Sequence, residues 1–160
     1  MRCTALHSRL VTVLGSGAIH RRGLVHQKGQ PMDFTLELVA IPVTDIDRAK
    51  SFYVDQVGFH PDHDVTVSDE IRFVQLTPPG SACSIALGKG LVESAPGSHE
   101  GLQLVVSDIH AARSELVQRW VEVSEVQEFP WGAFVFFSDP DGNGWAVQGG
   151  TSSKWSDVPA

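Results

Sequence analysis

The sequence lacks any long apolar run and is poor in cysteine. No stretch approaches the about 20 consecutive apolar residues that a membrane-spanning helix needs, so no membrane partner is predicted. The two cysteines, Cys3 and Cys83, exclude a disulfide-stapled framework and favour a reducing compartment, and we therefore expect a cytoplasmic protein. Cys83 belongs to no nucleophile motif and is expected to be an ordinary, half-buried small residue.

Acidic residues are missing from the first 31 residues, although the chain holds 19 of them. From Met32 onward, seven basic residues stand against all 19 acidic ones, which gives a net charge of −12. A surface this negative repels phosphate backbones, which excludes nucleic acid as a partner.

The first 31 residues also keep no steady hydrophobic period. Three interpretations stay open for residues 1–31: a weak signal-peptide core over residues 10–19, a basic transit peptide, or a non-native extension before a translation start at Met32. We favour the third. We expect residues 1–31 to be disordered or non-native, residues 34–150 to form a single domain, and residues 151–160 to be a flexible tail.

The acidic part of the chain contains an internal repeat. Residues 43–46 (Val-Thr-Asp-Ile) match residues 106–109 (Val-Ser-Asp-Ile), and residues 73–74 (Phe-Val) match residues 134–135 (Phe-Val). The offset drifts from 63 to 60 residues along the chain, so the two copies differ by small loop changes.

Each copy, over residues 34–88 and 101–149, predicts one strand, one helix and three further strands. Asp45 is placed to cap the first helix and Gly58 to end it, whereas Trp120 ends the second and is a candidate dimer contact. The predicted strands are residues 36–43, 60–67, 71–77, 82–87, 102–106, 121–126, 133–138 and 143–148, and the predicted helices are residues 45–57 and 108–120. The expected fold class is α+β: duplicated βαβββ units forming a curled, cup-shaped mixed sheet around a hollow, with helices on the outer face.

Two motifs stand near the ends of this duplicated region. The first is residues 39–49 (Val-Ala-Ile-Pro-Val-Thr-Asp-Ile-Asp-Arg-Ala), followed by residues 52–53 (Phe-Tyr) and 57–59 (Val-Gly-Phe). The second is residues 134–143 (Phe-Val-Phe-Phe-Ser-Asp-Pro-Asp-Gly-Asn), in which the two aspartates are expected to shape a tight turn. Together they resemble the opening and closing signatures of the vicinal oxygen chelate superfamily, the group of glyoxalase I, bleomycin-resistance proteins and extradiol dioxygenases.

In metal-using members of that superfamily, four strand positions converge on one divalent ion, usually through His and Glu, which suit Zn, Ni, Fe or Mn. The resemblance, together with the repeat offset, assigns these positions to Leu38, Ala86, Gly101 and Ala146. None of these residues can coordinate a cation. We therefore expect no metal site and no divalent-metal cofactor.

A second group of residues contains metal-ligand types: His60, Asp62, His63 and Asp64. In a regular strand, His60, Asp62 and Asp64 would share one face. The neighbouring Pro61 and the high polarity favour an exposed edge or loop instead.

Strand alternation from the four superfamily positions predicts which side chains face the hollow. The predicted cavity residues are Leu38, Ala40, Ser84, Ala86, Gly101, Gln103, Gly144, Ala146 and Gln148. Trp131 and Phe136 are candidates for an aromatic wall and Arg72 for an anion partner, although packing or a solvated position explains each of them as well. Gln103 and Gln148 lie in otherwise apolar strands and need hydrogen-bond partners if buried, which a ligand can supply.

Three functions stay open, and no residue is assigned a catalytic role. The favoured one is a metal-independent protein that binds a small organic molecule, similar to bleomycin-resistance members; that resemblance also implies a homodimer. The second is a metal-dependent lyase, dioxygenase or isomerase of the glyoxalase type, which requires a different strand alignment. The third is a metal-free enzyme of the same superfamily, whose acid–base pair would be invisible in the sequence.

Overall fold

The computed structural model describes residues 32–69, 71–89 and 91–150, without the side chain of residue 89. The chain divides into two compact units, Met1–Phe34 and Thr35–Ala160, and every element named below belongs to the second. The predictions for residues 1–31 and 151–160 lie outside the described residues. Within the described ranges, no helix is long and apolar enough to cross a membrane.

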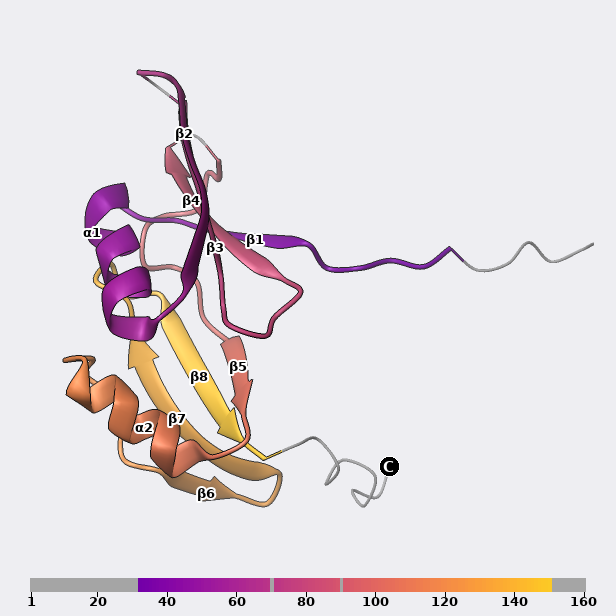
Figure 1. Cartoon of the computed structure of the whole chain (residues 1–160), viewed down its shortest axis with the longest axis vertical. Coiled ribbons are helices and arrows are strands. Elements are labelled where there is room, and N and C mark those ends of the chain that lie inside the picture. The colour runs from indigo at the N-terminus through magenta and orange to yellow at the C-terminus, as the bar shows by residue number, and fades with distance from the viewer. Residues whose placement is uncertain (1–31, 70, 90, 151–160) are drawn as a thin grey trace, which may run out of the picture. The chain divides into compact units, whose positions relative to one another are not determined.

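The second unit is built from two copies of one βαβββ arrangement (Figure 1). The first copy contains β1 (Leu38–Ile41), α1 (Ile46–Ser51), the π-helix η1 (Phe52–Val57), β2 (His60–Ser68), β3 (Ile71–Thr77) and β4 (Ser84–Lys89). The second contains β5 (Leu102–Val106), α2 (Ile109–Gln118), β6 (Gln127–Phe129), β7 (Gly132–Ser138) and β8 (Gly144–Gly149). The predicted α+β class and its duplication are confirmed.

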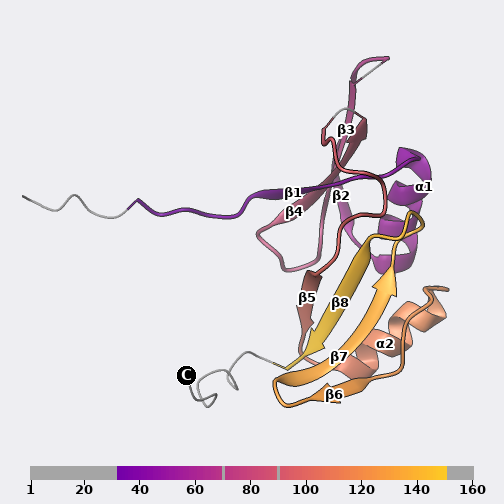
Figure 2. The same ribbon diagram turned by 180° about the vertical axis from the view of Figure 1, so that it is seen from behind.

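The two copies form sheets with the same strand order. Sheet 1 has the order β1-β4-β3-β2, and sheet 2 has the order β5-β8-β7-β6. In each, the first strand runs parallel to the last strand of its copy, and the other neighbours are antiparallel. The helix of each copy lies against one face of its own sheet (Figure 2). The opposite face is here called the helix-free face.

The first helix begins and ends where the sequence predicts, but its second half is a π-helix. The Asp45 side chain accepts a hydrogen bond from the backbone N–H of Arg48 at 3.0 Å, and Gly58 follows the helix with φ = 94°. The Tyr53 carbonyl accepts from the N–H groups of both Gly58 (2.9 Å) and Phe59 (2.8 Å). These longer-range bonds define the wider turn, which buries the Tyr53 ring completely.

The region after the second helix differs from the prediction. α2 ends at Gln118, and Trp120 takes φ = 65°, the left-handed conformation that terminates a helix. The strand predicted over residues 121–126 is wrong, because only Val123 in it makes a bridge, to Phe137. The Ser124 hydroxyl, instead of a backbone carbonyl, accepts from the N–H of Phe136 at 3.0 Å, so the ladder beside β7 is interrupted. β4 also starts two residues later than predicted, at Ser84.

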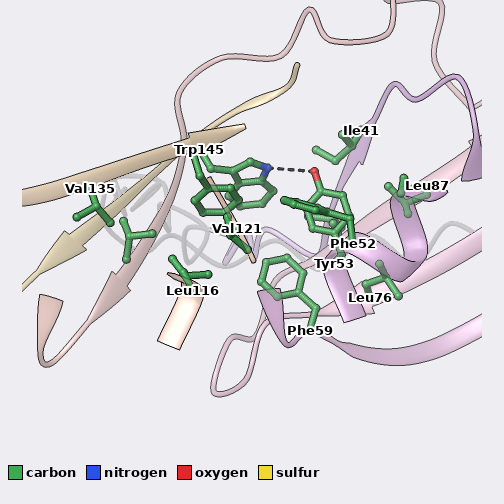
Figure 3. Packing of buried hydrophobic residues seen from close by; sticks show 14 of the residues in the cluster. Ile41, Phe52, Tyr53, Phe59, Leu76, Leu87, Leu116, Val121, Val135 and Trp145 are labelled. Atoms are coloured by element: carbon green, nitrogen blue, oxygen red, sulfur yellow. Dashed lines mark hydrogen bonds between the residues drawn. The ribbon is translucent and has the colours of Figure 1, made fainter. Parts of the chain in front are cut away.

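The hydrophobic core lies on the helix-covered faces and draws on both copies. In the core cluster, β3 and β4 of the first copy and β7 and β8 of the second contribute residues from alternate positions. The Tyr53 ring stacks on Phe59 of the same copy at 5.5 Å and meets Trp145 of the second copy edge-on at 5.8 Å (Figure 3). These rings join the two copies into one core.

A buried hydrogen-bond network ties the closing turn of the second copy to the first copy. The Oδ2 atom of Asp139 accepts from the Tyr53 hydroxyl at 2.9 Å and from the Asn143 side-chain amide at 2.7 Å. The indole N–H of Trp145 donates to the Tyr53 oxygen at 3.0 Å (Figure 3), and Asn143 also donates to the Pro42 carbonyl at 3.0 Å. Burial raises the pKa of Tyr53, and the Asp139 charge raises it further, so the phenol stays protonated and donates.

Candidate ligand-binding site

The helix-free face of sheet 1 carries four of the predicted cavity residues. They are Leu38 and Ala40 of β1 and Ser84 and Ala86 of β4, which alternate with core side chains of the same strands. The register pairs Leu38 with Ser84 and Ala40 with Ala86, so the four side chains form one patch. Gln75 of β3 is paired with Ala86 and shares this face. A polar amide therefore stands beside two alanines.

The helix-free face of sheet 2 carries four more of them. Gln103 lies on β5, Phe136 on β7, and Ala146 and Gln148 on β8. The register pairs Ala146 with Gln103 on one side and with Phe136 on the other. The small Ala146 side chain thus lies on the floor between an amide and an aromatic ring.

A cavity of about 530 Å³ opens beside Phe136 and Ala146. Gly101 and Gly144, both predicted cavity residues, also line it, together with Glu122 and Ser138. Gly101 has φ = 79°, and a Cβ atom added there would meet no heavy atom within 4 Å. Space is therefore left at one of the positions where the superfamily resemblance expects a metal ligand.

Four aromatic rings form a continuous row at sheet 2. Phe129 stacks on Trp131 with centroids 5.5 Å apart and meets Phe134 edge-on at 5.7 Å, and Phe134 stacks on Phe136 at 6.2 Å. Trp131 lies between β6 and β7 and is 46% exposed, and Phe136 is 39% exposed. The row therefore offers two ring surfaces that the described residues leave open.

The two glutamines of sheet 2 find partners inside the protein. The Nε2 atom of Gln103 donates to Oε1 of Gln148 at 2.7 Å, and Nε2 of Gln148 donates to the Trp131 carbonyl at 3.3 Å. Gln148 is buried, which explains why its amide needs both bonds.

A longer chain of polar side chains crosses the helix-free face of sheet 1. Nε2 of Gln75 donates to Oγ of Ser84 at 3.1 Å, and the hydroxyls of Ser84 and Thr77 are 2.6 Å apart. Thr77 donates to the Asp62 carboxylate, which also contacts Nδ1 of His60 at 3.2 Å. The bond from Thr77 lowers the pKa of Asp62, and the contact with His60 lowers it further, against the opposing effect of burial. The carboxylate is therefore ionised at neutral pH.

Arg72 lies away from these faces, contrary to the prediction. Arg72 is two residues before Val74 and four before Leu76 in β3. Because every second residue of a strand faces the same way, its side chain shares the helix-covered face of sheet 1 with these core residues. The Nη2 atom of its guanidinium pairs with Asp64 at 3.0 Å and with Asp47 of α1 at 2.9 Å. Arg72 is thus held in a surface ion-pair group and lines neither cavity.

The group of His60, Asp62, His63 and Asp64 does not share one face either. Asp62 binds Thr77 on the helix-free side, whereas Asp64 is 2.7 Å from Lys50 of α1 on the other side. The pairing of β2 with β3 shifts register between Pro61 and His63, which breaks the two-residue alternation.

A second cavity, of about 570 Å³, lies between the two copies. It is bounded by residues 78–81 of the β3–β4 turn, by β5 and by α2, with Phe59 and Phe137 among its lining residues. Gln103 is the only predicted site residue that lines it. An ion pair between Arg119 and Glu115, at 2.5 Å, stands at this cavity.

The side chains at Leu38, Ala86, Gly101 and Ala146 offer no nitrogen, oxygen or sulfur atom. In the parts of the chain that the structure describes, no group of three or more His, Cys, Asp or Glu residues could hold a metal ion. The donor set of a divalent ion is therefore not present at these four positions.

Sequence reasoning missed several residues of these faces, notably Gln75, Thr77, Phe129 and Phe134. Gln75 could have been found by the argument that singled out Gln103, because it is also polar in a largely apolar strand. The two phenylalanines carried no such signal, since an aromatic residue in a strand is usual.

Comparisons with known proteins agree on one family. A family model described as the glyoxalase/bleomycin resistance protein/dioxygenase superfamily matches residues 35–147. The structure of TnmS3, an antibiotic binding protein from Streptomyces sp. CB03234, is 34% identical, covers 76% of this chain and 100% of its own, and superposes with a TM-score of 0.69. A glyoxalase/bleomycin resistance protein from the same organism is 36% identical, with coverages of 71% and 99% and a TM-score of 0.64. The uncharacterized protein YetH of Bacillus subtilis (strain 168) is 27% identical over 107 residues, 66% of this chain and 89% of its own length.

Proposed function

Because the chain belongs to the glyoxalase/bleomycin resistance protein/dioxygenase superfamily, we propose that it binds a small organic molecule on the helix-free faces of its sheets, without a metal ion. The observation that carries the proposal is the aromatic row of sheet 2, whose exposed Phe136 ring borders a cavity of about 530 Å³. A similar protein, TnmS3, is an antibiotic binding protein, which supports a binding role of this kind.

The chemistry of the face suits an organic ligand with a flat ring. Phe136 and Trp131 present open ring surfaces, and aromatic rings prefer to stack or meet edge-on at about 4.5–7 Å. The small residues Ala146 and Gly101 line the cavity next to Phe136. The cavity volume of about 530 Å³ falls within the roughly 300–1,000 Å³ of typical small-molecule sites.

A metal-free mode of binding follows from the four superfamily positions. Leu38, Ala86, Gly101 and Ala146 supply no donor atom, and the described residues form no group of three or more His, Cys, Asp or Glu that could hold a metal ion. Ligand recognition then depends on shape, ring contacts and hydrogen bonds from the side chains.

We also propose that the protein is a homodimer in which a second copy covers part of these faces. Val105 of β5 is 60% exposed and lies on the helix-free face of sheet 2, as does Phe136, which is 39% exposed. Large apolar side chains exposed on one face are typical of an interaction site. The free thiol of Cys83 fits a reducing compartment, so a cytoplasmic location stays part of the proposal.

Thermal shifts of the full chain test the proposal. We expect 2-naphthol, a flat aromatic probe, to raise the unfolding temperature, because ligands that bind the folded state stabilise it by mass action. Zn²⁺, Ni²⁺, Mn²⁺ and Fe²⁺ are expected to cause no shift at micromolar concentrations. Stabilisation by one of these metals at an amount equimolar with the protein would overturn the proposal that the protein binds its ligand without a metal ion.

The variant Phe136→Ala locates the site. Loss of the exposed ring is expected to weaken 2-naphthol binding about tenfold, which corresponds to roughly 1.4 kcal/mol. Val117→Ala is the matched control, because Val117 is similarly exposed, at 47%, but lies on α2. Equal losses in the two variants would contradict a site at Phe136.

A further inference from the structure

The polar chain on sheet 1 has a fixed hydrogen-bond direction. The ionised Asp62 carboxylate can only accept, so the Thr77 hydroxyl must donate to it. The Thr77 oxygen then accepts the proton of Ser84, at 2.6 Å. Since the single hydroxyl proton of Ser84 is used, Gln75 must approach Ser84 with its Nε2 donor, at 3.1 Å. The carboxylate therefore decides which way the Gln75 amide points.

This direction leaves the carbonyl oxygen of Gln75 available. Its Oε1 atom has no hydrogen-bond partner among the described residues, and no buried polar atom of Gln75 is left unsatisfied. The residue paired with it in β4 is Ala86, and the next strand places Ala40 beside Ala86. Gln75 itself is half-buried, so part of its side chain is exposed on this face.

The same logic holds on sheet 2, with a different anchor. The backbone carbonyl of Trp131 can only accept, so Gln148 donates to it through Nε2. Oε1 of Gln148 must then accept from Nε2 of Gln103, at 2.7 Å. Gln103 consequently also ends its chain with Oε1 unpaired among the described residues, and it lies across Ala146 from the Phe136 ring.

We propose that the amide oxygens of Gln75 and Gln103 are oriented acceptors that select ligands carrying hydroxyl or N–H donors. This inference rests on the proposed function and specifies its ligand class: an aromatic molecule with hydrogen-bond donors on its ring. Asp62, Thr77 and Ser84 are positioning residues for Gln75, and Gln148 is the positioning residue for Gln103.

Two probes that differ in one donor test the inference. 2-Naphthol carries a hydroxyl, and 2-methoxynaphthalene has the same rings with that donor removed. Equilibrium dialysis against the full chain gives the affinity for each. We expect 2-naphthol to bind about fivefold more tightly, the fold-change that one net hydrogen bond of about 1 kcal/mol provides.

Variants then assign the preference to the two oxygens. Gln75→Met and Gln103→Met keep the side-chain length but remove the acceptor, and together they are expected to bring the affinity ratio close to one. Gln118→Met is the matched control, because Gln118 is an exposed residue at the end of α2. It is expected to leave the ratio unchanged.

The positioning role has its own readout. Asp62→Asn allows the residue at position 62 to donate, so the chain on sheet 1 loses its fixed direction, and the ratio is expected to fall in a variant that still unfolds cooperatively. Asp62→Glu restores an acceptor-only anchor and is expected to recover the ratio. A purely structural role for Asp62 would change the unfolding temperature and leave the ratio as it was.

The outcomes separate the two proposals. Equal affinities of the wild type for the two probes would overturn the donor preference while leaving small-molecule binding intact. Absence of binding by both probes up to their solubility limits would overturn the binding function and the preference with it.

Discussion

The two copies of the βαβββ unit share a strand order but carry different chemistry on their helix-free faces. Gln75 in β3 and Phe136 in β7 occupy equivalent positions, each paired with an alanine of the last strand, Ala86 or Ala146. One copy therefore presents an amide in a polar chain, and the other presents a ring in an aromatic row. On the helix-covered faces, by contrast, Val74 of β3 and its counterpart Val135 of β7 are both buried valines.

The difference shows which face of a duplicated sheet is constrained by folding. Core side chains must fill the space beneath a helix at close packing, so their apolar character persists in both copies. Side chains on the helix-free face have no such neighbour within the copy. That face can therefore diverge, and the two helix-free faces come to expose different side chains.

The closing turns of the two copies differ as well. Residues 139–143 hold the buried Asp139 network that reaches Tyr53 in the other copy, whereas residues 78–81 of the first copy lie exposed or half-buried at the 570 Å³ cavity. We infer that the second turn fastens the copies together and that the first turn does not.

Removing the carboxylate of Asp139 tests that difference and has the largest expected effect. In Asp139→Ala, the Tyr53 hydroxyl and the Asn143 amide lose an acceptor in a buried place, and the free energy of unfolding is expected to fall by about 3 kcal/mol. Urea denaturation at pH 7 measures it. Ser81→Ala in the first turn is the control and is expected to change stability by less than about 0.5 kcal/mol. Similar losses in both variants would refute the asymmetry.

The helix ends offer a smaller test. Gly58 ends the first helix at φ = 94°, whereas Trp120 follows the second at φ = 65° and is 87% exposed. Left-handed backbone costs a residue with a Cβ atom about 1–2 kcal/mol, partly offset by the entropy of glycine in the unfolded chain. Trp120→Gly is therefore expected to raise the free energy of unfolding by about 0.5–1 kcal/mol in urea denaturation.

Gly58→Ala is the complementary change. Besides the positive φ, a Cβ atom at Gly58 would lie 2.7 Å from the Arg119 side chain, so this variant is expected to lose stability. If Trp120→Gly is also destabilising, then the indole makes a stabilising contact, and the predicted role of Trp120 in a dimer interface gains support over the strain argument.

Much of the fold could be predicted because its signals are local. The Asp45 cap, the glycine that ends the first helix and the alternation within β1, β4, β5 and β8 all follow from neighbouring residues. The same alternation correctly identified which side chains of these strands face away from the helices. Their role in binding a ligand stays a prediction.

The remaining features depend on contacts between distant residues. The register shift in β2 separates Asp62 from Asp64, and nothing in the spacing of the two aspartates signals it. The ion pair of Arg72 with Asp47 also joins residues far apart in the sequence, although its spacing by an even number of residues from the core residues of β3 already indicates the helix-covered face. The segment before β6 alternates like a strand, but the Ser124 hydroxyl takes a bond that a ladder would need.

The first copy should also be the more sensitive to acid. Hydrogen bonds from Arg72, and then from Lys50, hold the pKa of Asp64 well below its ordinary value, so the folded state binds fewer protons there than the unfolded state. The stabilisation is complete above the ordinary pKa of an aspartate, about 3.9, and is lost as the pH falls through the lower folded-state pKa.

Asp64→Asn is expected to cost about 0.5 kcal/mol at pH 7 and progressively less towards pH 2, in urea denaturation at low salt. Glu125→Gln in the second copy is the control. Among the described residues Glu125 has an ion pair with Arg113 alone, and its side chain is 84% exposed, so its loss should cost less. An equal cost in the two variants would contradict the difference between the copies.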